Sequence, residues 1–131
     1  MTEKGSEMLE NHLMVKNRFL SLAKLCAKIA ADKKGSKIHI LNVSKLTALT
    51  EYFVFITADS SPQIKAILDS IFKTLKEYHE ISPVHLEGRN MPSWAVIDYG
   101  GLVIHIMLPE QRDFYALDKM WAEARKIKFE G

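Results

Sequence analysis

The side chains in this sequence that come closest to a catalytic pattern are a carboxylate and an imidazole, Asp98 and His105. A carboxylate that orients an imidazole is half of the acid–histidine–nucleophile arrangement used in acyl transfer. The nucleophile is not evident, because Cys26 lies in a segment predicted to be a core helix and Ser93 directly precedes Trp94. A structural role is therefore favoured over catalysis: His105 satisfies a buried hydrogen bond inside a sheet, with help from Asp98.

The other chemistry-bearing residues do not form a site in the sequence. The remaining histidines show no metal-ligand spacing; they are His12, His39, His79 and His85. The chain contains neither a Gly-x-x-x-x-Gly-Lys phosphate loop nor a Gly-x-Gly-x-x-Gly dinucleotide loop. Tyr52, Phe53 and Phe55 lie in an apolar segment, so core packing explains them better than stacking on RNA bases. We predict no metal and no cofactor.

Asp98 and His105 belong to a segment, residues 94–107, in which two apolar runs flank a Gly-Gly pair. This pattern predicts a β-hairpin with a type I′ turn, because that turn needs φ > 0 at both central residues and glycine adopts it without strain. Counting outward from the turn pairs Asp98 with Val103. Side chains alternate across a strand, which gives the hairpin two faces. One face carries Ala95, Ile97, Tyr99, Leu102, Ile104 and Ile106. The other face carries Trp94, Val96, Asp98, Val103, His105 and Met107.

Both faces of the hairpin are apolar enough to need a cover. Helices of the same chain can cover one, and an apolar patch rimmed by polar groups is typical of a partner site on the other. Trp94 fits core packing and partner anchoring equally well, since tryptophan is enriched among interface hot spots. Tyr99, beside the turn, is expected to be exposed and is the better surface candidate. Val103 and Met107 add adaptable apolar area to the proposed surface.

Elements with helical and strand periodicity surround the hairpin in the order α-β-β-α-β-β-β-α. Apolar spacing predicts helices over residues 8–34, 61–78 and 111–126. Apolar, β-branched and aromatic runs predict strands over residues 37–43, 52–58 and 84–88. Gly35 is predicted to end the first helix, and Ser61 and Pro62 to begin the second, whose apolar face extends to Tyr78. Because helices are too few for a crossover at every strand pair, we expect a mixed sheet of about five strands. Residues 1–7 are predicted to be disordered, and residues 8–131 to form a single α/β domain.

Composition narrows the class of protein. The length of 131 residues fits one domain, and 47% hydrophobic with 26% charged residues is ordinary for a soluble globular chain. The single cysteine excludes an intrachain disulfide, no apolar run reaches membrane-spanning length, and the N-terminus has no apolar signal core. We interpret the chain as cytoplasmic. Residues 1–37 hold 8 Lys/Arg and 4 Asp/Glu, and residues 38–131 hold 10 and 12. A solvated helix face is the favoured reading of the basic segment, and a docking patch for RNA is the alternative.

The hairpin also carries a resemblance to a known family. Its W-x-x-x-D-Y-G-x-x-x-x-H pattern resembles the signature of the ribosomal silencing factors, also called the Iojap or YbeB-like family. Three further segments agree with that family in the right order: Glu-Tyr-Phe-Val at 51–54, Ser-Ser-Pro-Gln-Ile at 60–64 and Arg-Asp-Phe-Tyr-Ala-Leu-Asp-Lys-Met-Trp at 112–121. The match runs from about residue 36 to residue 122. Each motif alone is weak, but together they are specific.

The resemblance implies an α/β sandwich related to nucleotidyltransferases and a regulatory function. Such a factor would bind the large ribosomal subunit through large-subunit ribosomal protein fourteen, at the face that meets the small subunit. It would block subunit joining by steric occlusion and lower translation when nutrients are short, with no reaction catalysed. The charge of residues 1–37, rather than the resemblance, is what suggests an additional minor contact to ribosomal RNA. The family's site carries over onto Trp94, Asp98, Tyr99, Gly100 and His105.

The chain departs from the family pattern at three positions. Glu51 replaces the usual aspartate, Gly101 stands where an aspartate is common, and Asp59 stands where a glycine is usual. The first change is conservative, and the third is expected only to reshape the entry to a helix. The second removes a charge near the proposed contact and is expected to alter affinity.

Two other functions stay open at this point. A nucleotidyltransferase needs a Gly-Ser turn for the triphosphate and clustered carboxylates, usually Asp-x-Asp, for two Mg²⁺ ions. Gly35-Ser36 is present, but Asp-x-Asp occurs nowhere in the chain, which argues against catalysis. The third function is a self-associating scaffold, in which the apolar face closes against a second copy. A twofold dimer built on that face would compete with the ribosome.

Overall fold

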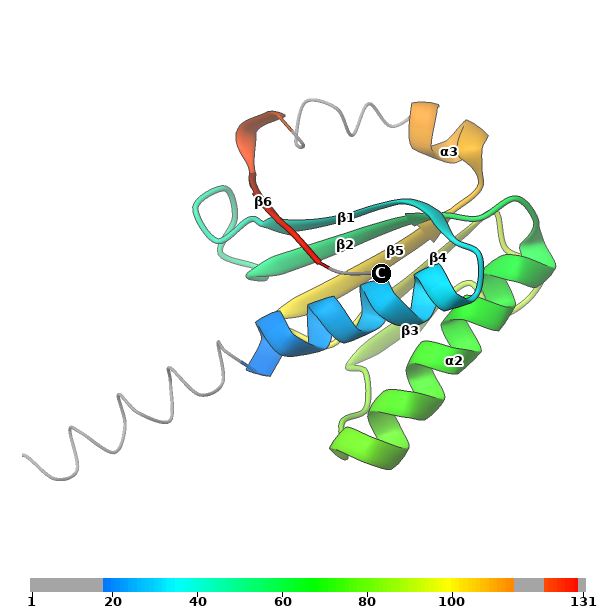
Figure 1. Cartoon of the computed structure of the whole chain (residues 1–131), viewed down its shortest axis with the longest axis horizontal. Coiled ribbons are helices and arrows are strands. Elements are labelled where there is room, and N and C mark those ends of the chain that lie inside the picture. Colours follow the sequence, from blue (N-terminus) through cyan, green and yellow to red (C-terminus); the bar gives the residue numbers. More distant parts are fainter. Residues whose placement is uncertain (1–17, 115–121, 130–131) are drawn as a thin grey trace, which may run out of the picture.

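The computed structural model describes residues 18–114 and 122–129, which form a mixed sheet with helices on both sides (Figure 1). The strand order is β3-β4-β5-β2-β1-β6. The strands are β1 (Ser36–Asn42), β2 (Tyr52–Thr57), β3 (His85–Glu87), β4 (Trp94–Asp98), β5 (Leu102–Met107) and β6 (Arg125–Ile127). The helices are α2 (Ser61–His79), α3 (Pro109–Phe114) and an N-terminal helix described over residues 18–32. Strands β2 and β5 are parallel and the other pairs are antiparallel, so the predicted mixed α/β sheet is confirmed.

The main core lies between the sheet and the two long helices, which cover the same face (Figure 1). Helix α2 buries the predicted apolar stripe, namely Ile64, Ile67, Leu68, Ile71 and Leu75. The N-terminal helix buries Leu22, Ala23, Cys26, Ala27 and Ala30. Both helices rest on the fully buried side chains Ile97 and Ile104 of the hairpin and their neighbours. The burial of these apolar side chains is the largest favourable contribution to the stability of the fold.

The hairpin forms with the predicted register, from Trp94 opposite Met107 to Asp98 opposite Val103. The turn differs from the prediction. Gly100 has a φ of 90°, but Gly101 does not have a positive φ. A positive φ at the first central residue alone is the pattern of a type II′ turn, which also matches the twist of the strands. Two glycines in a row therefore predict a tight turn but do not distinguish between the two primed types.

The helix ends also differ from the prediction by one residue. The N-cap of α2 is Ser60, whose hydroxyl accepts a hydrogen bond from the Gln63 backbone N–H at 3.2 Å, so Ser61 is already helical. At the end of the N-terminal helix the left-handed residue is Lys34, with a φ of 68°, rather than Gly35. Gly35 is needed for a different reason: a Cβ there would lie 2.9 Å from the Ala30 carbonyl oxygen.

The predicted third helix is wrong at its C-terminal end. It was expected to reach residue 126, but residues 125–127 form β6, which pairs antiparallel with β1. The exposed edge of β1 gives this segment a hydrogen-bonding partner, and pairing with a neighbour overrides a weak helical pattern. Tyr78 is also corrected: it is 76% exposed and does not belong to the buried stripe of α2. The predictions for residues 1–17 and 115–121 lie outside the described residues.

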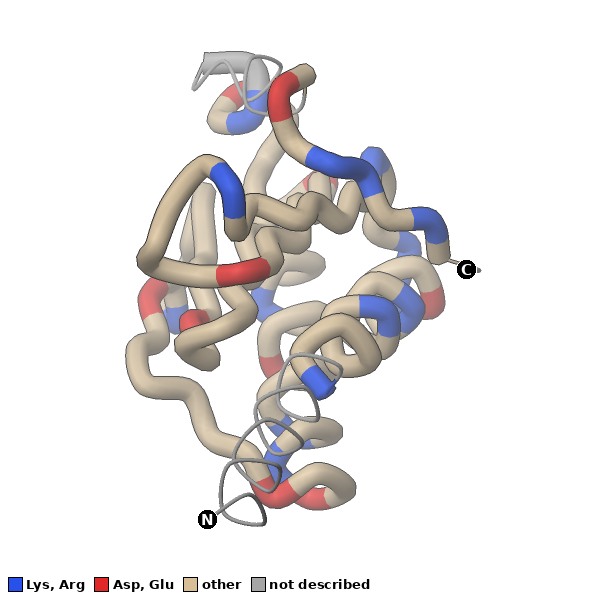
Figure 2. Tube along the Cα trace, turned by 90° about the vertical axis from the view of Figure 1, so that its left-hand side faces the viewer, with Lys and Arg blue, Asp and Glu red and all other residues tan. Residues whose placement is uncertain are grey.

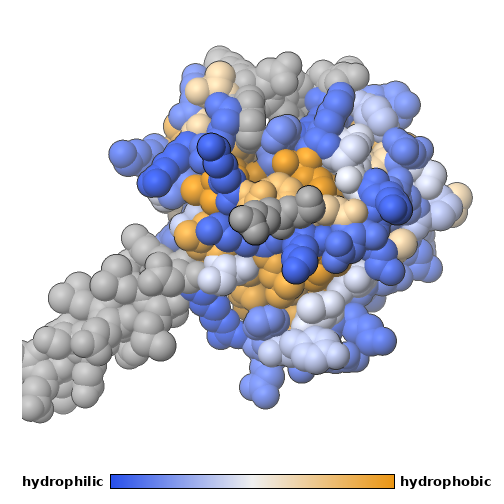
Figure 3. Space-filling view, viewed as in Figure 1, coloured by the Kyte–Doolittle hydropathy of each residue, from blue (hydrophilic) through white to orange (hydrophobic). Residues whose placement is uncertain are grey.

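The described residues cover the main core less completely where β6 approaches the N-terminal helix. Leu25, Ile29, Ile127 and Phe129 are only partly buried there. The space-filling view shows apolar side chains in this region, bordered by hydrophilic ones (Figure 3). In the described part of the chain, no helix is both long enough and apolar enough to cross a membrane.

Candidate partner-binding surface

Among the described residues, no long helix covers the second face of the sheet as the N-terminal helix and α2 cover the first. Strand register places on it Leu41 and His39 of β1, Phe53 and Phe55 of β2, Val103, His105 and Met107 of β5, and Trp94, Val96 and Asp98 of β4. A small second core of Leu41, Val43, Phe55, Met107 and Ala124 is buried here. Helix α3 lies on this side of the sheet at one end (Figure 1). The predicted second face therefore exists, and much of it is only half-buried.

A pocket of about 390 Å³ opens on this face, between the sheet and the loop of residues 43–51. It is lined by Val43, Leu46, Thr47, Leu49, Thr50, Phe53, Asp98, Val103 and His105. Three of these residues were predicted site residues: Asp98, Val103 and His105. We call this pocket the docking pocket. Its rim includes Leu49, whose side chain is 89% exposed.

His105 is held as a neutral ring by its neighbours. The Trp94 indole N–H donates to His105 Nδ1 at 3.1 Å, so this nitrogen carries no proton. The imidazole stacks on Phe55 with 5.1 Å between ring centroids, and the Phe53 ring meets its edge at 5.3 Å. The predicted structural role of His105 is thus supported, but its hydrogen-bond partner is Trp94 rather than Asp98. Trp94 is half-buried and belongs both to the second core and to the surface.

Burial lowers the pKa of His105 from 6.5 to about 4, and the nearby Asp98 carboxylate opposes this shift weakly. The unfolded chain therefore binds more protons than the folded protein between these two values. The contribution of a neutral His105 to the free energy of unfolding should be fully present near neutral pH and fall as the pH drops from about 6.5 toward 4. The expected loss is about 3 kcal/mol at pH 4. Urea unfolding at pH 7.5, 5.5 and 4 measures it.

The His105→Gln variant provides the control for this prediction, because a glutamine oxygen can still accept the Trp94 hydrogen bond. The variant should lose most of the pH dependence. A smaller dependence of the same sign is expected to remain, since burial and the positive charges of Arg112 and Lys126 also lower the pKa of His39. Parallel stability curves for the two proteins would show that His105 does not control the pH dependence.

Asp98 stabilises the hairpin turn and supplies charge to the docking pocket. Its Oδ1 accepts a hydrogen bond from the Gly100 N–H at 2.7 Å, which fixes the turn from inside the hairpin. With His105 neutral, Asp98 is the one charged group among the lining residues of the pocket. A partner that enters this pocket meets apolar walls and a single carboxylate.

Two predicted site residues lie elsewhere. Tyr99 was expected to be exposed, but it is 4% exposed and faces the main core with Ile97 and Leu102. The reason is alternation along β4, which puts residue 99 on the helix-covered side although it adjoins the turn. Gly100 is exposed at the turn, where a Cβ would meet open space. Met107 is on the predicted face but fully buried under it.

The structure also accounts for the family departure at Gly101. A Cβ at this position would lie 2.5 Å from a ring carbon of Phe19 in the N-terminal helix. Aspartate therefore does not fit here unless Phe19 moves. The effect of the missing charge on affinity for the partner stays a prediction.

Sequence reasoning missed the loop that forms one wall of the docking pocket. Residues 44–49 lie between two predicted strands and received no role in the sequence analysis, yet Leu46 is 46% exposed and Leu49 is 89% exposed. The sequence does show two leucines in a short segment between two predicted strands, and this pattern could have indicated an apolar contact surface. Phe53 was assigned to core packing, but it is half-buried and lines the pocket.

The described residues were also compared with the requirements of a metal site and of a reactive thiol. Within residues 18–114 and 122–129, no three His, Cys, Asp or Glu side chains come together as a metal site would require. Cys26 is fully buried in the main core, and burial raises the pKa of its thiol, which keeps it protonated and unreactive. The docking pocket is lined mainly by apolar side chains, together with two threonines, His105 and the Asp98 carboxylate.

Comparison with known proteins places these observations in a family. Residues 16–131 match the family model described as "Ribosomal silencing factor during starvation". A protein of Chromobacterium violaceum named "Ribosomal silencing factor RsfS" is 37% identical over 100 residues, which are 76% of this chain and 81% of that one. A mouse protein named "Mitochondrial assembly of ribosomal large subunit protein 1" is 34% identical over 74% of this chain and 43% of its own length. A crystal structure of a Chromobacterium violaceum protein has a TM-score of 0.74 and 34% identity, covering 86% of this chain and 92% of that one.

Proposed function

Because this chain belongs to the family of ribosomal silencing factors, we propose that it binds the large ribosomal subunit and prevents the small subunit from joining it. The direct partner is large-subunit ribosomal protein fourteen, at the face between the subunits. The result is repression of translation when nutrients are limiting. The protein acts in the cytoplasm as a regulator and catalyses no reaction.

The observation that carries this proposal is the second face of the sheet, with its docking pocket. Its apolar lining, exposed leucines and single carboxylate suit a protein partner better than a small substrate. Trp94, Val103 and His105 from the proposed site lie on this face, and Leu46, Leu49 and Phe53 extend it. The name of the mouse relative, which refers to the large ribosomal subunit, supports the choice of subunit.

The mechanism is occlusion by a rigid body. The sheet holds the docking face in place because its other side is packed against two long helices. A partner bound to the docking face leaves those helices projecting away from it. This bulk would occupy the space that the small subunit needs. No conformational change in the chain is required.

Sedimentation tests the proposal directly. The purified protein is mixed with separated large subunits and analysed on a sucrose gradient, and small subunits are then added. We expect co-migration with the large subunit and loss of the joined ribosome. Absence of co-migration at low salt would refute the proposal, and nucleotide binding with Mg²⁺ would then be tested for the enzyme alternative.

Self-association is the competing use of the same face. A second copy would bury the same docking pocket in a twofold dimer, and monomer and dimer would then be exchangeable states. Sedimentation velocity over a range of concentrations separates the two uses. Under the proposal, added large subunits should draw the protein out of any dimer. A dimer that persists with large subunits in excess would favour the scaffold.

A further inference from the structure

Charge is distributed unevenly over the described chain. Residues 18–37 carry six Lys or Arg and one Asp, and residues 122–129 carry three Lys or Arg and one Glu. Residues 38–114 carry six basic and nine acidic side chains. The two basic segments are far apart in sequence, but the basic positions of β6 run toward those of the N-terminal helix in the fold (Figure 2). The fold thus gathers cations that the sequence separates.

Strand register determines which way the β6 cations point. Ile127 pairs with Ile40, which is buried in the main core, and Arg125 pairs with Asn42. Side chains alternate, so Arg125 and Asn42 lie on the side of the sheet that the N-terminal helix covers. Lys24 and Lys28 are exposed on that helix, and Lys128 is exposed just beyond β6. We call Lys24, Lys28, Lys45, Arg125 and Lys128 the basic edge.

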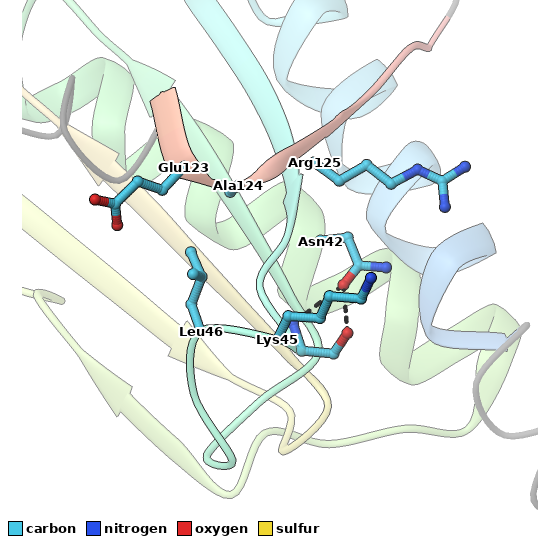
Figure 4. A pocket seen from close by; sticks show the side chains of 7 residues that line it. Asn42, Lys45, Leu46, Glu123, Ala124 and Arg125 are labelled. Atoms are coloured by element: carbon cyan, nitrogen blue, oxygen red, sulfur yellow. Dashed lines mark hydrogen bonds between the residues drawn. The ribbon is translucent and has the colours of Figure 1, made fainter.

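One end of the basic edge forms a pocket of about 340 Å³. It is lined by Asn42, Ser44, Lys45, Leu46, Glu123, Ala124 and Arg125. In the close-up, the Lys45 amine lies beside the Asn42 amide, and Arg125 extends toward the N-terminal helix (Figure 4). The Glu123 carboxylate points to the opposite side (Figure 4). The pocket therefore has a cationic half and a separate acidic rim.

Hydrogen bonding within the pocket uses the Ser44 donors but leaves those of the Asn42, Lys45 and Arg125 side chains without a partner among the described residues. Asn42 Oδ1 accepts from the Ser44 N–H at 3.0 Å and from the Ser44 hydroxyl at 2.7 Å. The Asn42 amide is thereby oriented with its NH₂ group as the free end. Lys45 and Arg125 are exposed, and neither forms an ion pair with another described residue. An NH₂ group, an ammonium and a guanidinium together suit a phosphate oxygen.

We propose that the basic edge binds the phosphate backbone of RNA, with one phosphate held by Asn42, Lys45 and Arg125. The basic edge contains cations but no aromatic side chain on which a base could stack. Such a surface contacts the phosphate backbone and does not distinguish one base from another. The choice of RNA as the polyanion rests on the proposed function. The pocket of Asn42, Lys45 and Arg125 adjoins the docking pocket, and Leu46 lines both. The chain would then dock where a ribosomal protein meets ribosomal RNA.

Fluorescence anisotropy with a labelled 20-base-pair RNA duplex tests the inference. The full chain, the double variant Lys45→Gln/Arg125→Gln and the control Lys65→Gln/Lys73→Gln are titrated at 50, 100 and 200 mM KCl. The control removes the same charge from exposed positions on α2. We expect the double variant to bind roughly 5-fold or more weakly at 50 mM KCl, with a salt slope lower by about 1 to 2. The control should retain most of the affinity and the slope.

Three results would overturn the inference. The first is that the double variant binds the duplex as tightly as the unmodified chain. The second is that the control variant weakens binding as much as the double variant does, which would mean that only the net charge of the protein matters. Tighter binding to phosphatidylglycerol vesicles than to the duplex, lost in the same double variant, would assign the edge to a lipid surface.

The failure of this inference is distinguishable from the failure of the proposed function. If the double variant still binds the duplex and large subunits like the unmodified chain, the basic edge is only a solvated surface and the silencing function stands. If the unmodified chain binds the duplex through the edge but does not co-sediment with large subunits, the proposed function falls and the RNA site remains.

Discussion

Replacing Leu49 with aspartate is expected to weaken binding to the large ribosomal subunit by roughly 30-fold or more, equivalent to about 2 kcal/mol. The side chain is 89% exposed, so its loss removes little from the folded core. In the complex it would lie in an apolar contact, where an unpaired carboxylate is costly to desolvate. The Asp98 carboxylate in the same pocket adds repulsion. Co-sedimentation with large subunits gives the affinity, and the urea unfolding midpoint should stay unchanged.

Met91→Asp is the matched control for this experiment. Met91 is 79% exposed, and it lies in the loop between β3 and β4, away from the residues that line the docking pocket. The Met91→Asp variant should bind large subunits with the same affinity as the unmodified chain. Equal affinity of Leu49→Asp and Met91→Asp would exclude the docking pocket as the contact. Trp94→Ala is also expected to weaken binding, by about 1–3 kcal/mol, but its hydrogen bond to His105 makes a change in stability part of that result.

The sequence was sufficient for the hairpin because the relevant information is local. Pairing from Trp94 with Met107 to Asp98 with Val103 needs only the position of the Gly-Gly turn and the alternation of side chains. The mixed sheet also followed, since the number of helices limits the number of crossovers. Strand β6 did not follow. Its three residues become a strand because the edge of β1 is open beside them, and nothing in the segment itself reveals that edge.

The candidate site was predicted in part for a related reason. Both faces of the hairpin are apolar, so composition alone does not decide which face the long helices cover. The fold places the long helices on the face of Ile97, Tyr99 and Ile104, and a pocket opens on the face of Val103 and His105. The pocket itself depends on the loop of residues 43–51 folding over the sheet. The pocket thus brings together positions about 50 residues apart in sequence, such as Leu49 and Val103, and periodicity does not predict such long-range pairings.

The position of Tyr99 in the main core leads to opposite predictions for two substitutions. Tyr99→Ala should lose about 4 kcal/mol of unfolding free energy, because removing a buried aromatic ring leaves a cavity. Tyr99→Phe should keep the ring and gain up to about 1 kcal/mol, because the Tyr99 hydroxyl is buried without a hydrogen-bond partner in the described structure. Burial raises the pKa of this phenol, so the hydroxyl is neutral at pH 7.5. Urea unfolding at pH 7.5 measures both variants.

Tyr78 supplies the control for this pair, since its side chain is 76% exposed on α2 and the same two substitutions there should each change stability by less than about 0.5 kcal/mol. Binding to large subunits separates a core role from an interface role. A core tyrosine predicts that Tyr99→Phe retains full affinity, because the hydroxyl never meets the partner. If Tyr99→Phe instead keeps its stability and loses affinity, the tyrosine reaches the partner, and the assignment of the two faces of the hairpin would have to be reversed.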